Sequence, residues 1–190
     1  MGSKSIGALG ACCALTLAAG VVLHAPAARA QMPRGIFSEI RVGLQAHDVP
    51  VFSPGIESGV DINAELLFTS PNFLRFIGSP RPHLGFSANT QGGMSQVYVG
   101  LSWQFQVWRG LFAGFSLGGA LHSGPLNSEF ANRDQKVFGS RGLFRESIEI
   151  GWRFGEHHSL SIMMDHISNA RLAHPNPGME TVGVRYGYRF

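Results

Sequence analysis

Hydrophobic and polar residues alternate with a period of two along most of the chain after residue 35. In the segment 95–107, Val97, Val99, Leu101, Trp103, Phe105 and Val107 alternate with Gln96, Tyr98, Gly100, Ser102, Gln104 and Gln106. Successive side chains of a β-strand point to opposite faces, so this period predicts strands rather than helices. The same pattern predicts eight strands, at 36–46, 60–68, 82–89, 95–107, 111–121, 142–154, 158–168 and 180–190.

One face of these strands is large and apolar, whereas the other is polar, charged or glycine. A soluble sandwich would bury the apolar face. A small outer-membrane barrel turns that face to lipid and fills its narrow interior with polar and glycine residues. The sequence therefore predicts an all-β fold, an eight-stranded antiparallel transmembrane β-barrel of the bacterial outer membrane.

The lengths of the connections favour the same fold. Very short joins at 108–110 and 155–157 contrast with long ones at 47–58, 122–140 and 169–178. Outer-membrane barrels have short periplasmic turns and longer extracellular loops. The connection 69–81 is longer than a standard periplasmic turn. The final strand ends on Phe190, which resembles the C-terminal signature of bacterial outer-membrane proteins.

The first 30 residues are expected to be a cleaved signal peptide, which leaves a barrel domain at 31–190. Lys4 precedes an apolar stretch at 6–23, and Ala28-Arg29-Ala30 is a small-x-small cleavage site. Both cysteines lie in this segment, so no disulfide or cysteine-based metal site is expected. Beyond it, 13 basic residues face 12 acidic ones, and no basic run suggests nucleic acid. No later stretch has eighteen consecutive apolar residues, so no membrane-spanning helix is expected.

Three residues near the C-terminus have the chemistry of an acyl-transfer site. His166 is a base, Ser168 a hydroxyl and Glu180 a carboxylate, the groups of a nucleophilic triad. All three continue the apolar rows of their strands, so they are expected on the outer wall near the extracellular rim. Polar groups in a lipid-facing row need partners, and these three can be each other's.

The segments 166–170 (His-Ile-Ser-Asn-Ala) and 176–180 (Asn-Pro-Gly-Met-Glu) resemble the signature of the lipid A 3-O-deacylases, the PagL family. The strand segment 59–65 resembles the family more weakly. The resemblance implies an eight-stranded outer-membrane barrel with a Ser-His-Glu triad, whose roles pass to Ser168, His166 and Glu180. It also implies a serine esterase that hydrolyses the 3-hydroxyacyl chain at the 3 position of lipid A in lipopolysaccharide.

Neighbouring residues are candidates for supporting roles. Asn169 or Asn176, with backbone amides near Gly178, are candidate oxyanion donors. Arg171 and His174, in the loop beside the triad, are candidates for contact with the anionic headgroup of lipopolysaccharide. No metal site and no cofactor are expected.

Two further expectations concern charged residues outside the triad. Asp165 has the opposite parity to His166 and is expected inside the barrel, paired with Arg145 or Arg185. Lys136 lies in the long loop 122–140. This loop could contact the phosphates and sugars of lipopolysaccharide, but it is expected to be solvated.

Two alternative functions remain open at this point. The chain could be a non-enzymatic structural or adhesive barrel whose polar rim residues only meet lipid headgroups. It could also pass the acyl group to an alcohol rather than to water. Outer-membrane lipids are the expected surroundings in each case, and a homodimer is left open.

Overall fold

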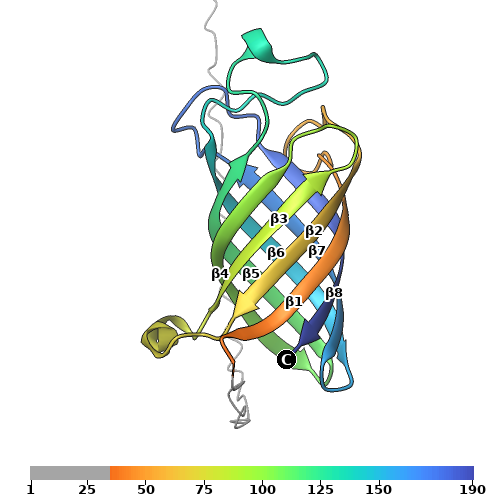
Figure 1. Ribbon diagram of the computed structural model, residues 1–190, viewed down its shortest axis with the longest axis vertical. Helices are drawn as coiled ribbons and strands as arrows, with labels where there is room; N and C mark the ends of the chain where they lie inside the picture. Colours follow the sequence, from red (N-terminus) through yellow and green to blue (C-terminus); the bar gives the residue numbers. More distant parts are fainter. Residues whose placement is uncertain (1–34) are drawn as a thin grey trace, which may run out of the picture. The chain divides into compact units, whose positions relative to one another are not determined.

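The computed structural model describes residues 35–190, which form a closed barrel of eight antiparallel strands (Figure 1). The strands are β1 (Phe37–Ala46), β2 (Val60–Phe68), β3 (Arg81–Asn89), β4 (Gln96–Trp108), β5 (Leu111–His122), β6 (Gly142–Phe154), β7 (His158–Ser168) and β8 (Met179–Arg189). Each strand pairs with the next along the chain, and β8 closes the barrel against β1. All eight predicted strands are confirmed, with bounds that agree within one residue. The expected signal peptide lies outside the described residues.

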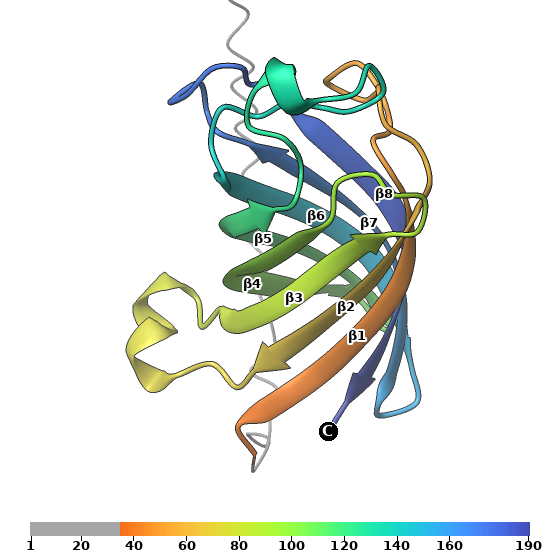
Figure 2. The same ribbon diagram turned by 45° about the horizontal axis from the view of Figure 1, so that its top comes forward.

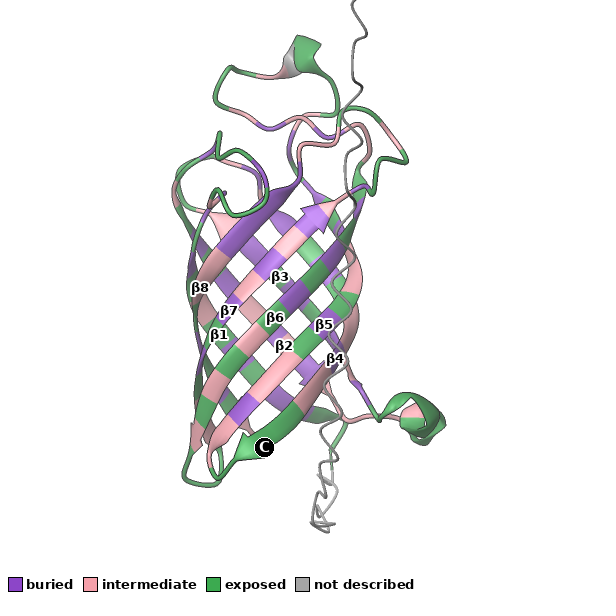
Figure 3. Cartoon of the chain, turned by 180° about the vertical axis from the view of Figure 1, so that it is seen from behind, coloured by how far each residue is buried: buried purple, intermediate pink, exposed green. Residues whose placement is uncertain are grey.

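Side chains alternate between the outer wall and the interior, as the sequence pattern predicts. Along β4, Val97 and Val99 are exposed whereas Gln96 and Tyr98 are buried. Figure 3 shows this alternation as bands of buried and exposed residues along the strands. The exposed row is apolar because it faces lipid, and the narrow interior is filled by polar side chains.

Charged residues in the interior form a closed network. Arg41 contacts Glu39 at 2.7 Å, Glu65 at 3.2 Å and Glu149 at 3.1 Å. Arg185 contacts Glu65 at 3.2 Å and Glu149 at 2.7 Å. An unpaired buried charge would be strongly destabilising, so the mutual pairing of these groups is what allows a charged barrel interior.

Asp165 also lies inside the barrel, as expected from its parity. Its carboxylate accepts hydrogen bonds from Arg145 Nε at 2.9 Å and from Thr181 Oγ1 at 2.6 Å. Of the two expected arginine partners, Arg145 is the one that contacts it.

The connections divide between the two ends of the barrel (Figure 1). One end carries four longer loops, between β1 and β2 (47–59), β3 and β4 (90–95), β5 and β6 (123–141), and β7 and β8 (169–178). The β5–β6 loop includes the 3₁₀ helix η2 (Ser128–Phe130). The other end carries short turns, the C-terminus, and a second 3₁₀ helix, η1 (Asn72–Ile77), which occupies the long connection between β2 and β3. Among the described residues, no helix is long and apolar enough to cross a membrane.

Candidate active site

His166 and Glu180 form a hydrogen-bonded pair between neighbouring strands. β7 and β8 are antiparallel, and their register places His166 directly opposite Glu180. Nδ1 of His166 donates to Oε1 of Glu180 at 2.6 Å. A neutral imidazole that donates from Nδ1 has its acceptor lone pair on Nε2. The pair therefore holds the histidine in the tautomer that can accept a proton at Nε2.

Glu180 belongs to the outward row of β8, yet its side chain is completely buried. The β1–β2 loop covers it. Ser53 of that loop donates to Oε2 of Glu180 from Oγ at 2.7 Å and from its backbone N–H at 3.2 Å. Parity correctly placed Glu180 on the outer wall, but the loop shields the carboxylate from lipid and satisfies its second oxygen.

Lys136, from the β5–β6 loop, is also completely buried, so the expectation of a solvated side chain is wrong. Its Nζ forms an ion pair with Asp48 and donates to Ser53 Oγ at 3.1 Å and to the Gly178 carbonyl at 2.7 Å. These contacts join three loops over the His166–Glu180 pair. The pairing with Asp48 is the physical reason that the ammonium is tolerated without water.

Glu57, held by the buried His47, adds a second buried link between the loops. Its Nδ1 and Nε2 each lie 2.9 Å from a carboxylate, of Asp61 and Glu57 respectively. Burial alone would lower the pKa of His47, but the hydrogen bonds and charges of Asp61 and Glu57 outweigh it and raise the pKa to about 9. Glu57 also accepts from the backbone N–H groups of Met94 at 2.6 Å and Lys136 at 2.7 Å.

Ser168 lies two residues beyond His166 in the same outward row of β7 and is partly buried. Its cross-strand neighbour on β6 is Phe144. Among the described residues, no hydrogen bond joins Ser168 to His166. The sequence correctly predicted that His166 and Ser168 share the outward face of β7. Their side chains are not hydrogen-bonded to each other in the described part of this structure. Nucleophile–base hydrogen bonds are often loose before substrate binds.

Two residues enclose the imidazole of His166. Gly178 has a φ of +73°, and a Cβ at this position would lie 3.1 Å from Cε1 of His166. Glycine adopts this left-handed conformation without steric cost, and a side chain here would press on the ring. Phe52 approaches the ring edge-on, with 6.5 Å between the ring centroids. These contacts leave the His166 side chain 29% exposed.

The other candidate residues lie in the β7–β8 loop. Asn169 Oδ1 accepts from the Arg171 N–H at 3.0 Å, and its Nδ2 donates to the Pro175 carbonyl at 3.2 Å. The Asn169 N–H donates to Asn176 Oδ1 at 2.8 Å. The two asparagines thus shape the loop. Each side-chain amide nitrogen carries two hydrogens, and the bond to Pro175 uses one of those of Asn169. Arg171 and His174 are exposed beside them.

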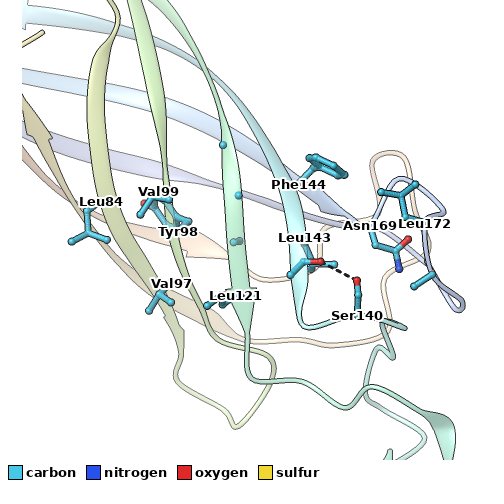
Figure 4. A pocket seen from close by; sticks show the side chains of 15 residues that line it. Leu84, Val97, Tyr98, Val99, Leu121, Ser140, Leu143, Phe144, Asn169 and Leu172 are labelled. Atoms are coloured by element: carbon cyan, nitrogen blue, oxygen red, sulfur yellow. Dashed lines mark hydrogen bonds between the residues drawn. The ribbon is translucent and has the colours of Figure 1, made fainter. Parts of the chain in front are cut away.

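Two apolar grooves lie on the outer wall near the site. The smaller, of about 300 Å³, is lined by Phe52, Glu146, Ser147, Ile148, Met164 and His166. The larger, of about 710 Å³, is shown in Figure 4 and extends over β4, β5 and β6 to the β7–β8 loop. Phe144 lines the larger groove and is the cross-strand neighbour of Ser168. A lipid chain bound in either groove would therefore run beside the candidate residues.

The larger groove exists because β5 presents a glycine in its outward row. Gly119 pairs with Val99 on one side and with Phe144 on the other. One row of paired residues thus crosses β4, β5, β6 and β7 and consists of Val99, Gly119, Phe144 and Ser168. Gly119 has no side chain to fill the space between Val99 and Phe144.

Sequence reasoning missed three residues of this site. Ser53 and Lys136 come from loops 113 and 30 residues before His166 along the chain, and no local pattern marks them. Glu146 lies directly opposite His166 on β6 and is exposed in the outward row. Glu146 could have been found from the sequence, because it is a charged residue within the otherwise apolar row of its strand.

A family model described as "Lipid A 3-O-deacylase (PagL)" matches residues 75–189, more than half of the chain. The chain belongs to the lipid A 3-O-deacylase (PagL) family. Members of this family are lipid A deacylases, and the barrel is an outer-membrane protein of that family. No curated protein sequence matches the chain significantly.

Solved structures match the fold of this deacylase-family chain. The crystal structure of the outer membrane enzyme PagL has a TM-score of 0.57 and 17% identity, covering 79% of this chain and 98% of that one. At this identity the likeness concerns the fold alone. The Yersinia pestis outer membrane protein Ail, solved in a phospholipid bilayer nanodisc, has a TM-score of 0.49 and 12% identity, covering 82% and 100% of the two chains.

Proposed function

We propose that this member of the family hydrolyses the ester-linked 3-hydroxyacyl chain at the 3 position of lipid A, with Ser168 as nucleophile, His166 as base and Glu180 as the carboxylate that orients His166. The main support for the proposal is the 2.6 Å hydrogen bond from His166 Nδ1 to Glu180. His166 lies in the same outward row of β7 as Ser168. A pair on the outer wall can reach a substrate whose acyl chains lie within the membrane.

The reaction follows from the tautomer that Glu180 selects. Nε2 of His166 accepts the Ser168 proton as the serine oxygen attacks the ester carbonyl carbon, and the imidazolium that forms is stabilised by Glu180. The tetrahedral intermediate collapses as the bond to the sugar oxygen breaks, and His166 returns the proton to that oxygen. Water, deprotonated by His166, then attacks the acyl-enzyme, releasing the fatty acid and restoring Ser168.

The β7–β8 loop supplies the supporting groups in this proposal. Asn169 Nδ2, Asn176 or a backbone amide near Gly178 would stabilise the oxyanion, since these groups lie in the loop that adjoins His166. Arg171 and His174 are exposed on the same loop and would meet the phosphates and sugars of lipopolysaccharide. The apolar grooves beside His166 and Phe144 would hold acyl chains.

The lipid A mass spectrum of cells expressing each variant tests the mechanism. Ser168→Ala, His166→Ala and Glu180→Ala should each reduce loss of the acyl chain below what this spectrum of whole cells detects, while the barrel still shows the heat-dependent gel mobility of a folded outer-membrane protein. Unchanged deacylation by Ser168→Ala would refute the assignment of the nucleophile. Recovery of the released chain as a free fatty acid, rather than as a new ester, identifies water as the acceptor.

The proposal also covers the N-terminal segment. We infer that the segment 1–30 is removed on export, with cleavage after Ala30, and that the domain 31–190 forms the barrel. N-terminal sequencing of the protein isolated from outer membranes should begin at Gln31, and a sequence that begins at Met1 would contradict the inference.

A further inference from the structure

The structure brings a hydroxyl and an ammonium group from two distant loops onto the carboxylate that orients His166. Ser53 donates twice to Oε2 of Glu180, and Lys136 donates to Ser53 Oγ. The hydroxyl hydrogen of Ser53 points to the carboxylate, because its oxygen already accepts from the Lys136 ammonium, which has no acceptor site of its own. The direction of both hydrogen bonds is therefore determined.

We propose that Ser53 and Lys136 are positioning residues for the deacylation reaction, an inference that rests on the proposed triad. They hold the Glu180 carboxylate so that Oε1 faces Nδ1 of His166. A carboxylate with one hydrogen-bonded oxygen can rotate away from its partner. Hydrogen bonds to both oxygens remove that freedom and keep the orientation that the tautomer of His166 requires.

The acceptors of the buried Lys136 ammonium place it directly beside the His166–Glu180 pair. The side chains of Lys136 and Asp48 are 0% exposed, in a loop region at the end of the barrel where water is available. Taking an ammonium out of water at such a place is unfavourable unless a counter-charge and hydrogen-bond acceptors compensate for the lost hydration. Its acceptors are Asp48, Ser53 and Gly178, of which the last two contact or adjoin the His166–Glu180 pair.

A double-mutant cycle between Ser53 and Glu180 tests the proposal. Ser53→Ala should lower kcat by roughly ten- to a hundredfold, the loss of a hydrogen bond to a charged group, with KM changed less than roughly twofold. In a Glu180→Ala background the same substitution should lower the residual kcat less than roughly threefold, because no carboxylate remains to be positioned. Ser123→Ala is the matched control, since within residues 35–190 the contact of Ser123 Oγ is with a backbone N–H of the β3–β4 loop.

Each outcome of the cycle has a distinct meaning. An unchanged kcat in Ser53→Ala, or an equal loss in both backgrounds, overturns the positioning role. Full activity of Glu180→Ala overturns the triad itself, and the positioning role with it. If Ser53→Ala does not fold, Ser53→Cys keeps the shape with a weak donor and should show the same loss of kcat; wild-type kcat in Ser53→Cys would overturn the proposal.

A second, independent feature is the 3₁₀ helix η1 at the opposite end of the barrel. A 3₁₀ helix has three residues per turn, so side chains at i and i+3 share an edge. Phe73 and Phe76 form one edge and are 73% and 83% exposed. Asn72 and Arg75 form a polar edge. Two exposed phenylalanines on one edge are an apolar patch that water does not favour.

We infer that this edge lies in the periplasmic lipid interface and anchors the β2–β3 connection there. Trp103 joins the helix to the lipid-facing wall: its Nε1 donates to the Ile77 carbonyl at 2.7 Å, and its ring stacks on Phe115 at 4.8 Å. The aromatic surface of the barrel thus continues directly onto η1. Aromatic side chains favour this interface, and Arg75 on the polar edge can meet lipid phosphates.

Spin labels on the two edges of η1 test this inference in lipid vesicles. The only native cysteines are Cys12 and Cys13, which are replaced by serine. A label at Phe76→Cys should collide severalfold more often with oxygen, relative to a water-soluble nickel complex, than a label at Arg75→Cys. A label at Glu129→Cys, at an exposed position of the β5–β6 loop at the other end, is the aqueous control. Equal ratios at positions 75 and 76, or shielding of position 76 from both reagents, would overturn the lipid contact.

Discussion

Gly178→Ala should impair catalysis as well as folding. The substitution places a methyl group in a left-handed conformation, which costs about 1–2 kcal/mol of folding free energy. The added Cβ would also lie 3.1 Å from Cε1 of His166, closer than ordinary contact, so the ring must move by a few tenths of an ångström. Because a displacement of about 1 Å can cost about a hundredfold in rate, we expect kcat to fall roughly tenfold.

Gly155→Ala is the matched control for this prediction. Gly155 has a φ of +62° in the β6–β7 turn, and its Cβ would meet only His158, at an ordinary 3.9 Å. Both variants should lose about 1–2 kcal/mol in urea unfolding followed by tryptophan fluorescence. Only Gly178→Ala should lose kcat in a lipid A deacylation time course. Equal kcat values for the two variants would refute the argument that contact with the His166 ring sets the rate.

Two further predictions concern the outer groove and the loops. A Cβ on Gly119 would meet nothing closer than 3.6 Å, so Gly119→Leu should fold normally. The leucine should fill the groove beside Phe144 and raise the KM for lipid A. An unchanged KM would show that the substrate does not use this groove. The pKa of His47 is raised to about 9 in the folded protein, so its contribution to stability is complete below pH 6.5 and is lost as pH rises through 9. At about 1.36 kcal/mol per pKa unit this contribution is at most about 3 kcal/mol, and unfolding measured from pH 6 to 10 should show it in the wild type but not in His47→Gln. The same pH slope in both proteins would contradict the assignment.

The sequence by itself determined the barrel and the side of its wall on which the candidate residues lie. Alternation is a property of the strand backbone, so it can be read at every position without knowing what the strand contacts. That parity placed His166, Ser168 and Glu180 in outward rows and Asp165 inside, and the structure agrees on both. The PagL-family resemblance could be recognised in a short stretch of chain because His166 and Ser168 lie on one strand and Glu180 lies on the next.

Only the tertiary structure decided what surrounds the His166–Glu180 pair. Ser53 and Lys136 reach Glu180 because three loops fold together over one end of the barrel. Loop conformation depends on contacts between segments far apart in the chain, and it leaves no periodic trace in sequence. The folding of these loops turned an apparently lipid-facing carboxylate into a buried one, and an apparently solvated lysine into part of its support.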